Sequence, residues 1–228
     1  MSSRIVQVRQ NVLKKNDLLA QSLRKRFEDA GVCVVSLVSS PGTGKTALLE
    51  RTLAAMAPVW RVAALVGDLA TDCDAARLKR SGAPVRQITT GTVCHLDAAM
   101  VDAALHDWDL ASLDFLFLEN VGNLVCPASY DLGESLRVVL LSVTEGEDKP
   151  LKYPTVFNTA DLAVITKVDL SDAVEFKRAE ALHNIAQVRP DLDVLEVSVR
   201  TDAGMPAWIA RLESTRSRVR QPSFSDIH

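Results

Sequence analysis

The sequence has few aromatic residues, few histidines and no large excess of either charge. Of its 228 residues 5% are aromatic and 4 are His, and the formal net charge is −3. Without a basic surplus no positive stripe can release counterions from a nucleic acid, so we expect no nucleic-acid partner. No apolar run reaches membrane-spanning length, and the opening residues 1–4 lack a signal-peptide core. These absences predict a cytoplasmic chain with no membrane contact.

Cysteine is also scarce, with 4 residues, which in a cytoplasmic setting favours thiols or metal ligands over disulfides. A hydrophobic content of 47% with 24% charged residues is typical of a globular protein. We expect residues 1–31 to form an amphipathic helix packed on the domain, residues 32–212 to form the domain, and residues 213–228 to be a disordered tail.

Apolar runs alternate with segments of helical periodicity through the predicted domain, which indicates an α/β fold. The expected fold has three layers, a mostly parallel twisted sheet flanked by helices, as in P-loop NTPases. Long helices are predicted over 5–27 and 173–188, and 145–154 is predicted to be a loop. The expected strands are 32–38, 62–66, 85–88, 115–118, 138–143, 162–165 and 194–197.

A phosphate-binding loop is predicted at 39–46, between the first strand and a helix start at Ala47. Backbone N–H groups of such a turn converge on an anion, with Gly42, Thr43 and Gly44 in the turn. Lys45 supplies a positive charge for the β- and γ-phosphates. The first Gly of the usual pattern is replaced by Ser39, which fits if its φ stays negative.

Acidic residues follow two of the predicted strands, where the chemistry of parallel sheets concentrates. Asp68 and Glu119 end strands, and Asp74 follows Asp68 closely. Mg²⁺ bound to phosphates needs one or two protein oxygens, which Thr46 with Asp68 or Glu119 would supply. Another carboxylate could hold the attacking water, so Lys45, Asp68, Asp74 and Glu119 are the candidate catalytic residues.

Base selection is predicted at Thr166-Lys167-Val168-Asp169, directly after a buried strand. A carboxylate such as Asp169 can accept two hydrogen bonds from guanine N1–H and the 2-amino group, which adenine does not offer. The segment therefore favours GTP over ATP and disfavours a kinase or an ATP-dependent ligase. The usual guanine-specific pattern begins with Asn, whereas this one begins with Thr166.

At this point the chain resembles the HypB family, GTPases that assist nickel insertion into [NiFe] hydrogenase. The similarity extends over about 5–212, and the stretch 119–133, which begins ENVGNLVCPA, is the most diagnostic. The other matching stretches are 39–42, 44–46, 67–68, 71, 74–75, 90–91, 94–98 and 144–154.

The resemblance implies a Mg²⁺-dependent GTPase of the signal-recognition and MinD-like class that forms a GTP-dependent homodimer. Gly122 and Ser198 then join the GTP/GDP-binding set, and Lys152 reaches the nucleotide of the neighbouring subunit. The implied partners are a hydrogenase-maturation metallochaperone and the hydrogenase large-subunit precursor. This chain has Thr92-Val93 where the family usually has a Lys and a variable residue, and it lacks the Cys-rich and His-rich N-terminal motifs, so we expect no nickel storage.

Cys94, His95 and Cys126 are the candidate ligands for Ni²⁺ or Zn²⁺, because thiolate and imidazole donors suit these ions. Cys33 is expected to be a core residue, and Cys73 has no evident partner. Two alternatives stay open: a urease-type nickel accessory GTPase, and a nucleotide-gated metal carrier or scaffold with negligible hydrolysis.

Overall fold

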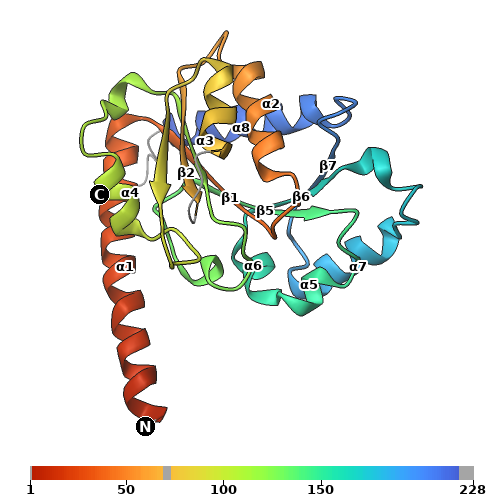
Figure 1. Cartoon of the computed structure of the whole chain (residues 1–228), viewed down its shortest axis with the longest axis horizontal. Coiled ribbons are helices and arrows are strands. Elements are labelled where there is room, and N and C mark those ends of the chain that lie inside the picture. The colour runs from red at the N-terminus through yellow and green to blue at the C-terminus, as the bar shows by residue number, and fades with distance from the viewer. Residues whose placement is uncertain (1, 69–72, 221–228) are drawn as a thin grey trace, which may run out of the picture.

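The computed structural model describes residues 2–68 and 73–220. Its centre is a sheet of seven parallel strands in the order β3-β2-β4-β1-β5-β6-β7 (Figure 1). The strands are β1 Cys33–Val38, β2 Val62–Asp68, β3 Val85–Thr89, β4 Phe115–Glu119, β5 Leu136–Ser142, β6 Leu162–Thr166 and β7 Val194–Val197. The sheet is entirely parallel, and the predicted α/β class is confirmed.

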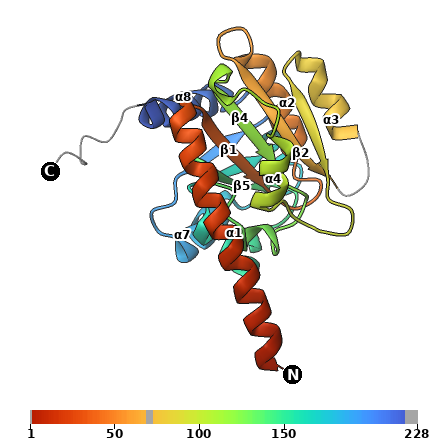
Figure 2. The same ribbon diagram turned by 90° about the vertical axis from the view of Figure 1, so that its left-hand side faces the viewer.

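Helices cover both faces of the sheet, so the central strands are buried on both sides, as their continuous apolar sequences predict. On one face α2, α3 and α8 pack over the sheet, and on the other α1 and α4 cover one half and α6 and α7 the other (Figures 1 and 2). The α-helices are α1 Ser2–Ala30, α2 Lys45–Met56, α3 Cys73–Leu78, α4 Ala98–Ala104, α5 Lys149–Lys152, α6 Pro154–Thr159, α7 Arg178–Val188 and α8 Met205–Arg220. Short 3₁₀ helices are η1 Lys79–Ser81, η2 Leu110–Ser112, η3 Pro127–Ser129 and η4 Val168–Leu170.

The long helix α1 lies beside α4, and its N-terminal part extends beyond the body of the molecule (Figure 2). Ala20, Leu23 and Phe27 are its buried apolar contacts with the sheet and α4. Gly133 comes so close to α1 that a Cβ there would lie 2.7 Å from the Ala20 carbonyl oxygen, and its φ is +79°. Only glycine fits at this contact. None of the helices in the described part of the chain is both long and apolar enough to cross a membrane.

Three predicted elements differ from the structure. The helix expected over 173–188 begins only at Arg178, because Glu175 has a positive φ of 53° and the Lys177 N–H donates to the Glu147 side chain. The segment expected to be a loop over 145–154 contains α5 and leads directly into α6.

The tail is the third difference, because α8 continues to Arg220 where disorder was expected from residue 213. Thr215 and Arg216 are buried, and Arg216 pairs with Asp114, so packing extends the helix beyond what its polar composition indicates. Residues 221–228 lie outside the described part of the chain.

Candidate functional site

The predicted phosphate-binding loop connects β1 to α2 at the centre of the sheet. Gly42 and Gly44 have φ values of 77° and 99°, a left-handed conformation that glycine adopts without strain. Ser39 is buried and its φ is not positive, so a serine fits here without backbone strain. The first turn of α2 begins at Lys45, directly after Gly44.

One oxygen of Glu119 receives contacts from both residues that open α2. The Thr46 hydroxyl donates to Glu119 Oε1 at 2.6 Å, and Lys45 Nζ lies 3.4 Å from the same atom. The other oxygen, Oε2, is buried and has no hydrogen-bond partner among the described residues. Burial raises the pKa of Glu119, the Lys45 charge and the Thr46 hydrogen bond act against this, and the Asp74 charge adds to it.

This arrangement fits a hard cation, since Mg²⁺ takes carboxylate and hydroxyl oxygens and Oε2 is a buried acceptor that no described residue satisfies. The structure puts Asp68 at the end of β2, which pairs with β4 so that Val66 lies opposite Glu119. Asp68 and Glu119 therefore lie at the same, C-terminal end of the sheet, and Asp74 of α3 is close enough for its charge to act on Glu119. Residues 69–72 between the two aspartates lie outside the description.

The predicted base-selecting segment contacts the phosphate loop directly. The Thr166 hydroxyl donates to the Thr43 carbonyl at 2.7 Å, and Lys167 Nζ donates to the Gly42 carbonyl at 2.7 Å. Thr166, the departure from the usual Asn, therefore ties this segment to the loop. Asp169 Oδ1 accepts from the Ser198 hydroxyl at 2.6 Å, which fixes the orientation of the carboxylate.

Two further contacts at the phosphate loop were missed from the sequence. Lys149 Nζ lies 3.3 Å from Ser40 Oγ, and the Thr43 hydroxyl donates to Glu145 at 3.0 Å. Both partners come from the segment that the sequence presents as one charged loop, and spacing alone does not single them out. Lys152 of the same segment pairs with Asp148 at 2.6 Å and faces solvent.

Cys94, His95 and Cys126 lie together, with one potential ligand atom from each within 4.8 Å of the others. The two sulfur atoms are 2.9 Å apart, and the His95 ring stacks on Tyr130 with centroids 3.9 Å apart. His95 Nδ1 is buried and has no hydrogen-bond partner among the described residues. Burial lowers the pKa of His95 against the opposing charge of Asp97, which favours the neutral, metal-binding form. Two thiols and an imidazole fit Ni²⁺ or Zn²⁺.

The other cysteines are separate from this group. Cys33 is buried in β1, where desolvation raises the pKa of its thiol to about 12, so it is a core residue as expected. The Cys73 side chain lies outside the description.

Two asparagines join the loops that carry these ligands. Asn120 Oδ1 accepts from the backbone N–H of Leu96 at 2.9 Å, and Asn123 Nδ2 donates to the Cys94 carbonyl at 3.3 Å. Neither side chain was predicted to have a role of its own, although both lie in the ENVGN stretch, where polar residues after a buried strand were the available signal. Through them the segment after β4 contacts both Cys94 and the residue after His95.

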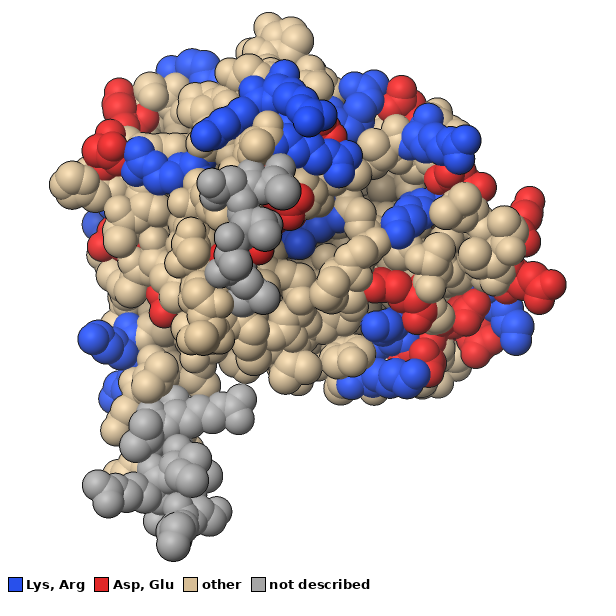
Figure 3. All heavy atoms as spheres, viewed as in Figure 1, with Lys and Arg blue, Asp and Glu red and all other residues tan. Residues whose placement is uncertain are grey.

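The phosphate loop and the metal-ligand group are connected by one segment, 119–126. A Cβ on Gly122 would lie 3.1 Å from Pro41 Cα, so this segment passes close against the phosphate loop. Figure 3 shows basic side chains gathered over α2 and α3 and mixed charges over α5 and α7. The surface between α1 and α5 in the same view carries few charges, and Val125, in the segment itself, is 62% exposed.

Comparison with known proteins identifies the family. The nucleotide-binding domain described as CobW/HypB/UreG matches residues 33–196. Hydrogenase maturation factor HypB of Azotobacter vinelandii is 48% identical over 221 residues, which cover 96% of this chain and 73% of the relative. HypB of Escherichia coli K12 is 45% identical over 213 residues, covering 93% of this chain and 73% of that protein.

Solved structures agree with the fold. A crystal structure of HypB from Helicobacter pylori in complex with nickel superposes with a TM-score of 0.85 at 39% identity, covering 92% of this chain and 99% of that one. HypB from Archaeoglobus fulgidus gives a TM-score of 0.83 at 36% identity, covering 89% and 99%. The chain therefore belongs to the HypB family of hydrogenase maturation factors, with the P-loop nucleotide-binding fold of the CobW/HypB/UreG group.

Proposed function

We propose that this chain is a Mg²⁺-dependent GTP hydrolase that acts in nickel insertion during hydrogenase maturation. In this proposal the GTP site and the Cys94–His95–Cys126 site are coupled, and the metal site lies at a GTP-dependent homodimer interface. The observation that carries it is the segment 119–126: its first residue contacts Lys45 and Thr46, and its last contributes one of the clustered thiols. The nickel complex of the Helicobacter pylori relative supports the choice of metal.

In the nucleotide site, Lys45 and the N–H groups of 42–47 would hold the phosphates, and Asp169 with Ser198 and Lys167 would hold guanine. Mg²⁺, when bound, would neutralise phosphate charge, held by Thr46 and by Asp68 or Glu119. Lys45 is released from Glu119 when it turns to the phosphates, which leaves the buried carboxylate of Glu119 in need of a new partner. Asp68 or Asp74 would orient the attacking water.

Coupling has a physical route through backbone contacts. A movement of Gly122 toward the γ-phosphate displaces the segment that contains Asn120, Asn123 and Cys126. Asn120 and Asn123 are bonded to the opposite loop, so Cys94 and His95 would move with them. Because coupling is reciprocal, metal changes GTP affinity by the same factor by which GTP changes metal affinity.

The dimer completes the metal site. Three ligands leave one position of a tetrahedral site open, and a two-fold axis would duplicate the set so that Cys126 could bridge. The exposed side chain of Val125, directly before Cys126 in the chain, supports an interface at this place. In the pathway, a metallochaperone partner and the hydrogenase large-subunit precursor would be the other components.

The test is a metal titration of reduced protein with and without a non-hydrolysable GTP analogue, repeated on Cys94→Ala and Cys126→Ala. We expect tighter or weaker metal binding with the analogue and loss of binding in both variants. Ser217→Ala, an exposed hydroxyl on α8, serves as a matched control. Identical affinity and stoichiometry in every sample would overturn both the site and the coupling.

Base selection is tested by Asp169→Asn. The amide cannot accept both guanine hydrogen bonds, so the variant should lose GTP and gain xanthosine triphosphate, measured by competition with a fluorescent nucleotide. Unchanged GTP affinity would remove Asp169 from the site.

Two alternatives stay open, and one of them has specific support. Relatives from Helicobacter carry the name hydrogenase/urease maturation factor, so delivery toward urease is a second candidate. It is tested by activating each apoenzyme with the nickel-loaded protein. A metal carrier with negligible hydrolysis is separated by phosphate release under saturating GTP, where isolated GTPases can turn over at about 10⁻³ per second or less.

A further inference from the structure

Asn16 is a buried amide on α1, 6% exposed, whose two ends bind different parts of the chain. Its Nδ2 donates to the Asp131 carbonyl at 2.8 Å, and its Oδ1 accepts from the Ala98 N–H at 2.9 Å. A buried polar side chain with both ends satisfied fixes the separation of the groups that it joins.

The two bonded segments are those that carry the metal-ligand candidates. Ala98 follows shortly after Cys94 and His95, and Asp131 follows shortly after Cys126. Asn120 and Asn123 already join these loops from the nucleotide side. Asn16 therefore joins them a second time, from α1.

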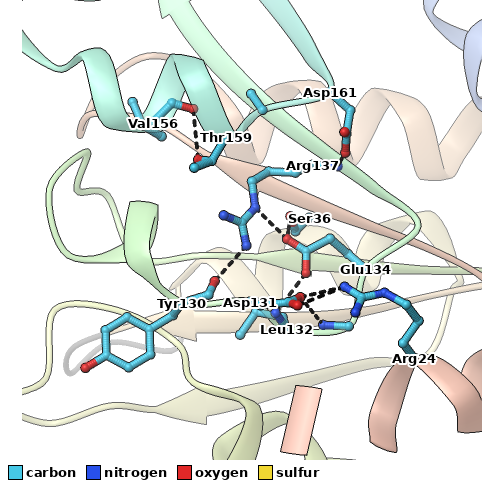
Figure 4. Close-up of polar contacts among 12 residues, drawn as sticks. Arg24, Ser36, Tyr130, Asp131, Leu132, Glu134, Arg137, Val156, Thr159 and Asp161 are labelled. Carbon is cyan, nitrogen blue, oxygen red and sulfur yellow. Dashed lines mark hydrogen bonds and ion pairs between the residues drawn. The ribbon is translucent and has the colours of Figure 1, made fainter. Parts of the chain in front are cut away.

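The Asp131 segment is held firmly, so the contact with Asn16 is not made to a free loop. Figure 4 shows Arg24 of α1 pointing to the Asp131 carboxylate, with bonds of 2.8 and 2.9 Å to its two oxygens. The same carboxylate accepts from the Gly133 N–H at 2.8 Å. The neighbouring Tyr130 carbonyl accepts from Arg137, while the Tyr130 ring points away and stacks on His95.

We propose that Asn16 is a positioning residue for the Cys94–His95–Cys126 metal site, setting the separation of the two ligand loops from outside the nucleotide-binding machinery. This inference rests on the metal binding proposed above. Replacing Asn16 by the similarly sized Leu leaves the Ala98 N–H and the Asp131 carbonyl without their partner. The two loops then shift independently, and the thiols and imidazole lose their arrangement.

The experiment measures Zn²⁺ affinity by competition with a chromophoric chelator on the full chain, in the presence of reductant. Asn16→Leu should bind Zn²⁺ about 10-fold more weakly, the lower end of the effect seen when groups that orient metal ligands are removed. With Co²⁺ as the probe, its visible spectrum should change in shape, because the spectrum reports coordination geometry. GTP affinity measured without Zn²⁺ or Co²⁺ should stay at the wild-type value.

Arg26 of α1 provides a matched control. Arg26 bonds to the Asp102 carboxylate and to the Leu105 carbonyl, both at 3.1 Å, so it also ties α1 to α4 but touches neither ligand loop. Arg26→Gln should keep the wild-type Zn²⁺ affinity and Co²⁺ spectrum. Equal weakening in Arg26→Gln and Asn16→Leu would overturn the proposal, because the effect would then be a general loss of α1 packing.

Wild-type Zn²⁺ affinity and Co²⁺ spectrum in Asn16→Leu would also overturn the proposal. If Asn16→Leu does not fold, Asn16→Asp answers the question, because it keeps the acceptor for Ala98, while its ionised carboxylate lacks the donor to Asp131 and repels that carbonyl. Normal metal binding by Asn16→Asp would count against the role of Asn16 in the same way. Wild-type affinity in Cys126→Ala would instead show that the proposed metal site is wrong, which distinguishes the two failures.

Discussion

Strand β4 has a buried carboxylate at each end, and the two differ in their partners and in the direction of their pKa shifts. Asp114, directly before the strand, is held by Arg61, Arg216 and Arg220. Hydrogen bonds from the Arg61 side chain, followed by those of Arg216, hold the pKa of Asp114 well below its usual range. Glu119, at the other end, has one oxygen without a hydrogen-bond partner among the described residues, and burial raises its pKa.

The difference indicates a structural role for Asp114 and a functional role for Glu119. Asp114 satisfies the rule that buried charges are paired, and it anchors α8 and the start of β2 to the edge of the sheet away from the nucleotide site. Glu119 leaves part of that rule unmet among the described residues, which fits a partner such as a cation or nucleotide-bound group. Perturbed groups of this kind cluster at functional sites.

The largest expected effect tests the functional role of Glu119. Glu119→Gln should lower the rate of GTP hydrolysis about 100- to 1000-fold, as for the loss of one preorganised electrostatic group. The midpoint of urea unfolding of the nucleotide-free protein should stay the same or rise, because a desolvated charge is removed. Phosphate release and urea unfolding on the same preparation check both. Normal turnover with a lower unfolding midpoint would make Glu119 a structural residue.

The same type of substitution at the other end of β4 should do the reverse. Asp114→Asn removes the charge that three arginines share and should lower the free energy of unfolding by about 3 kcal/mol. GTP affinity should not change. Asp161→Asn is the control: Asp161 also precedes a strand and bonds to the Arg137 N–H, but it faces solvent. Equal losses of unfolding free energy in Asp114→Asn and Asp161→Asn would mean that the three arginines add nothing to the stability contributed by Asp114.

The pH dependence of stability should have opposite signs for the two carboxylates. The stability contributed by Asp114 is present above its unfolded pKa of about 3.9 and is lost as the pH falls toward its depressed folded value. The contribution of Glu119 is present below about 4.3 and is lost as the pH rises through its elevated folded value. The gap between wild type and Asp114→Asn should therefore narrow in acid, whereas any advantage of Glu119→Gln should grow toward neutral pH. Urea unfolding in chelator at several pH values measures both, and parallel curves would contradict the assignment.

The sequence was sufficient for the sheet because its inner strands are largely apolar runs that must be covered on both faces. The loop over 39–46 follows β1 as the sequence predicts, and the candidate ligands Cys94, His95 and Cys126 lie together. The sequence was not sufficient for α8, whose polar C-terminal turns are held by the long-range pair Arg216–Asp114, or for Asn16, whose partners are distant in the chain. Such polar contacts have no periodicity, so no local pattern reveals them.

The smallest expected effect is at Lys152, where the comparison can fail. Lys152 is exposed and already paired with Asp148, so by the reasoning applied to Asp114 it would be structural, and Lys152→Ala should change stability by less than about 0.5 kcal/mol. The family resemblance instead assigns it to the nucleotide of a neighbouring subunit.

Lys149, one turn away, contacts Ser40 of its own phosphate loop and provides the matched comparison. Lys149→Ala should weaken GTP binding by the monomer, whereas Lys152→Ala should weaken GTP-dependent dimerisation and leave monomer affinity intact. Sedimentation with GTP analogue and with GDP measures dimerisation, and nucleotide titration at dilute protein measures monomer affinity. If Lys152→Ala changes neither or both equally, the contact across the interface is wrong. If it changes dimerisation alone, a residue satisfied within one chain becomes functional only when the second chain is present.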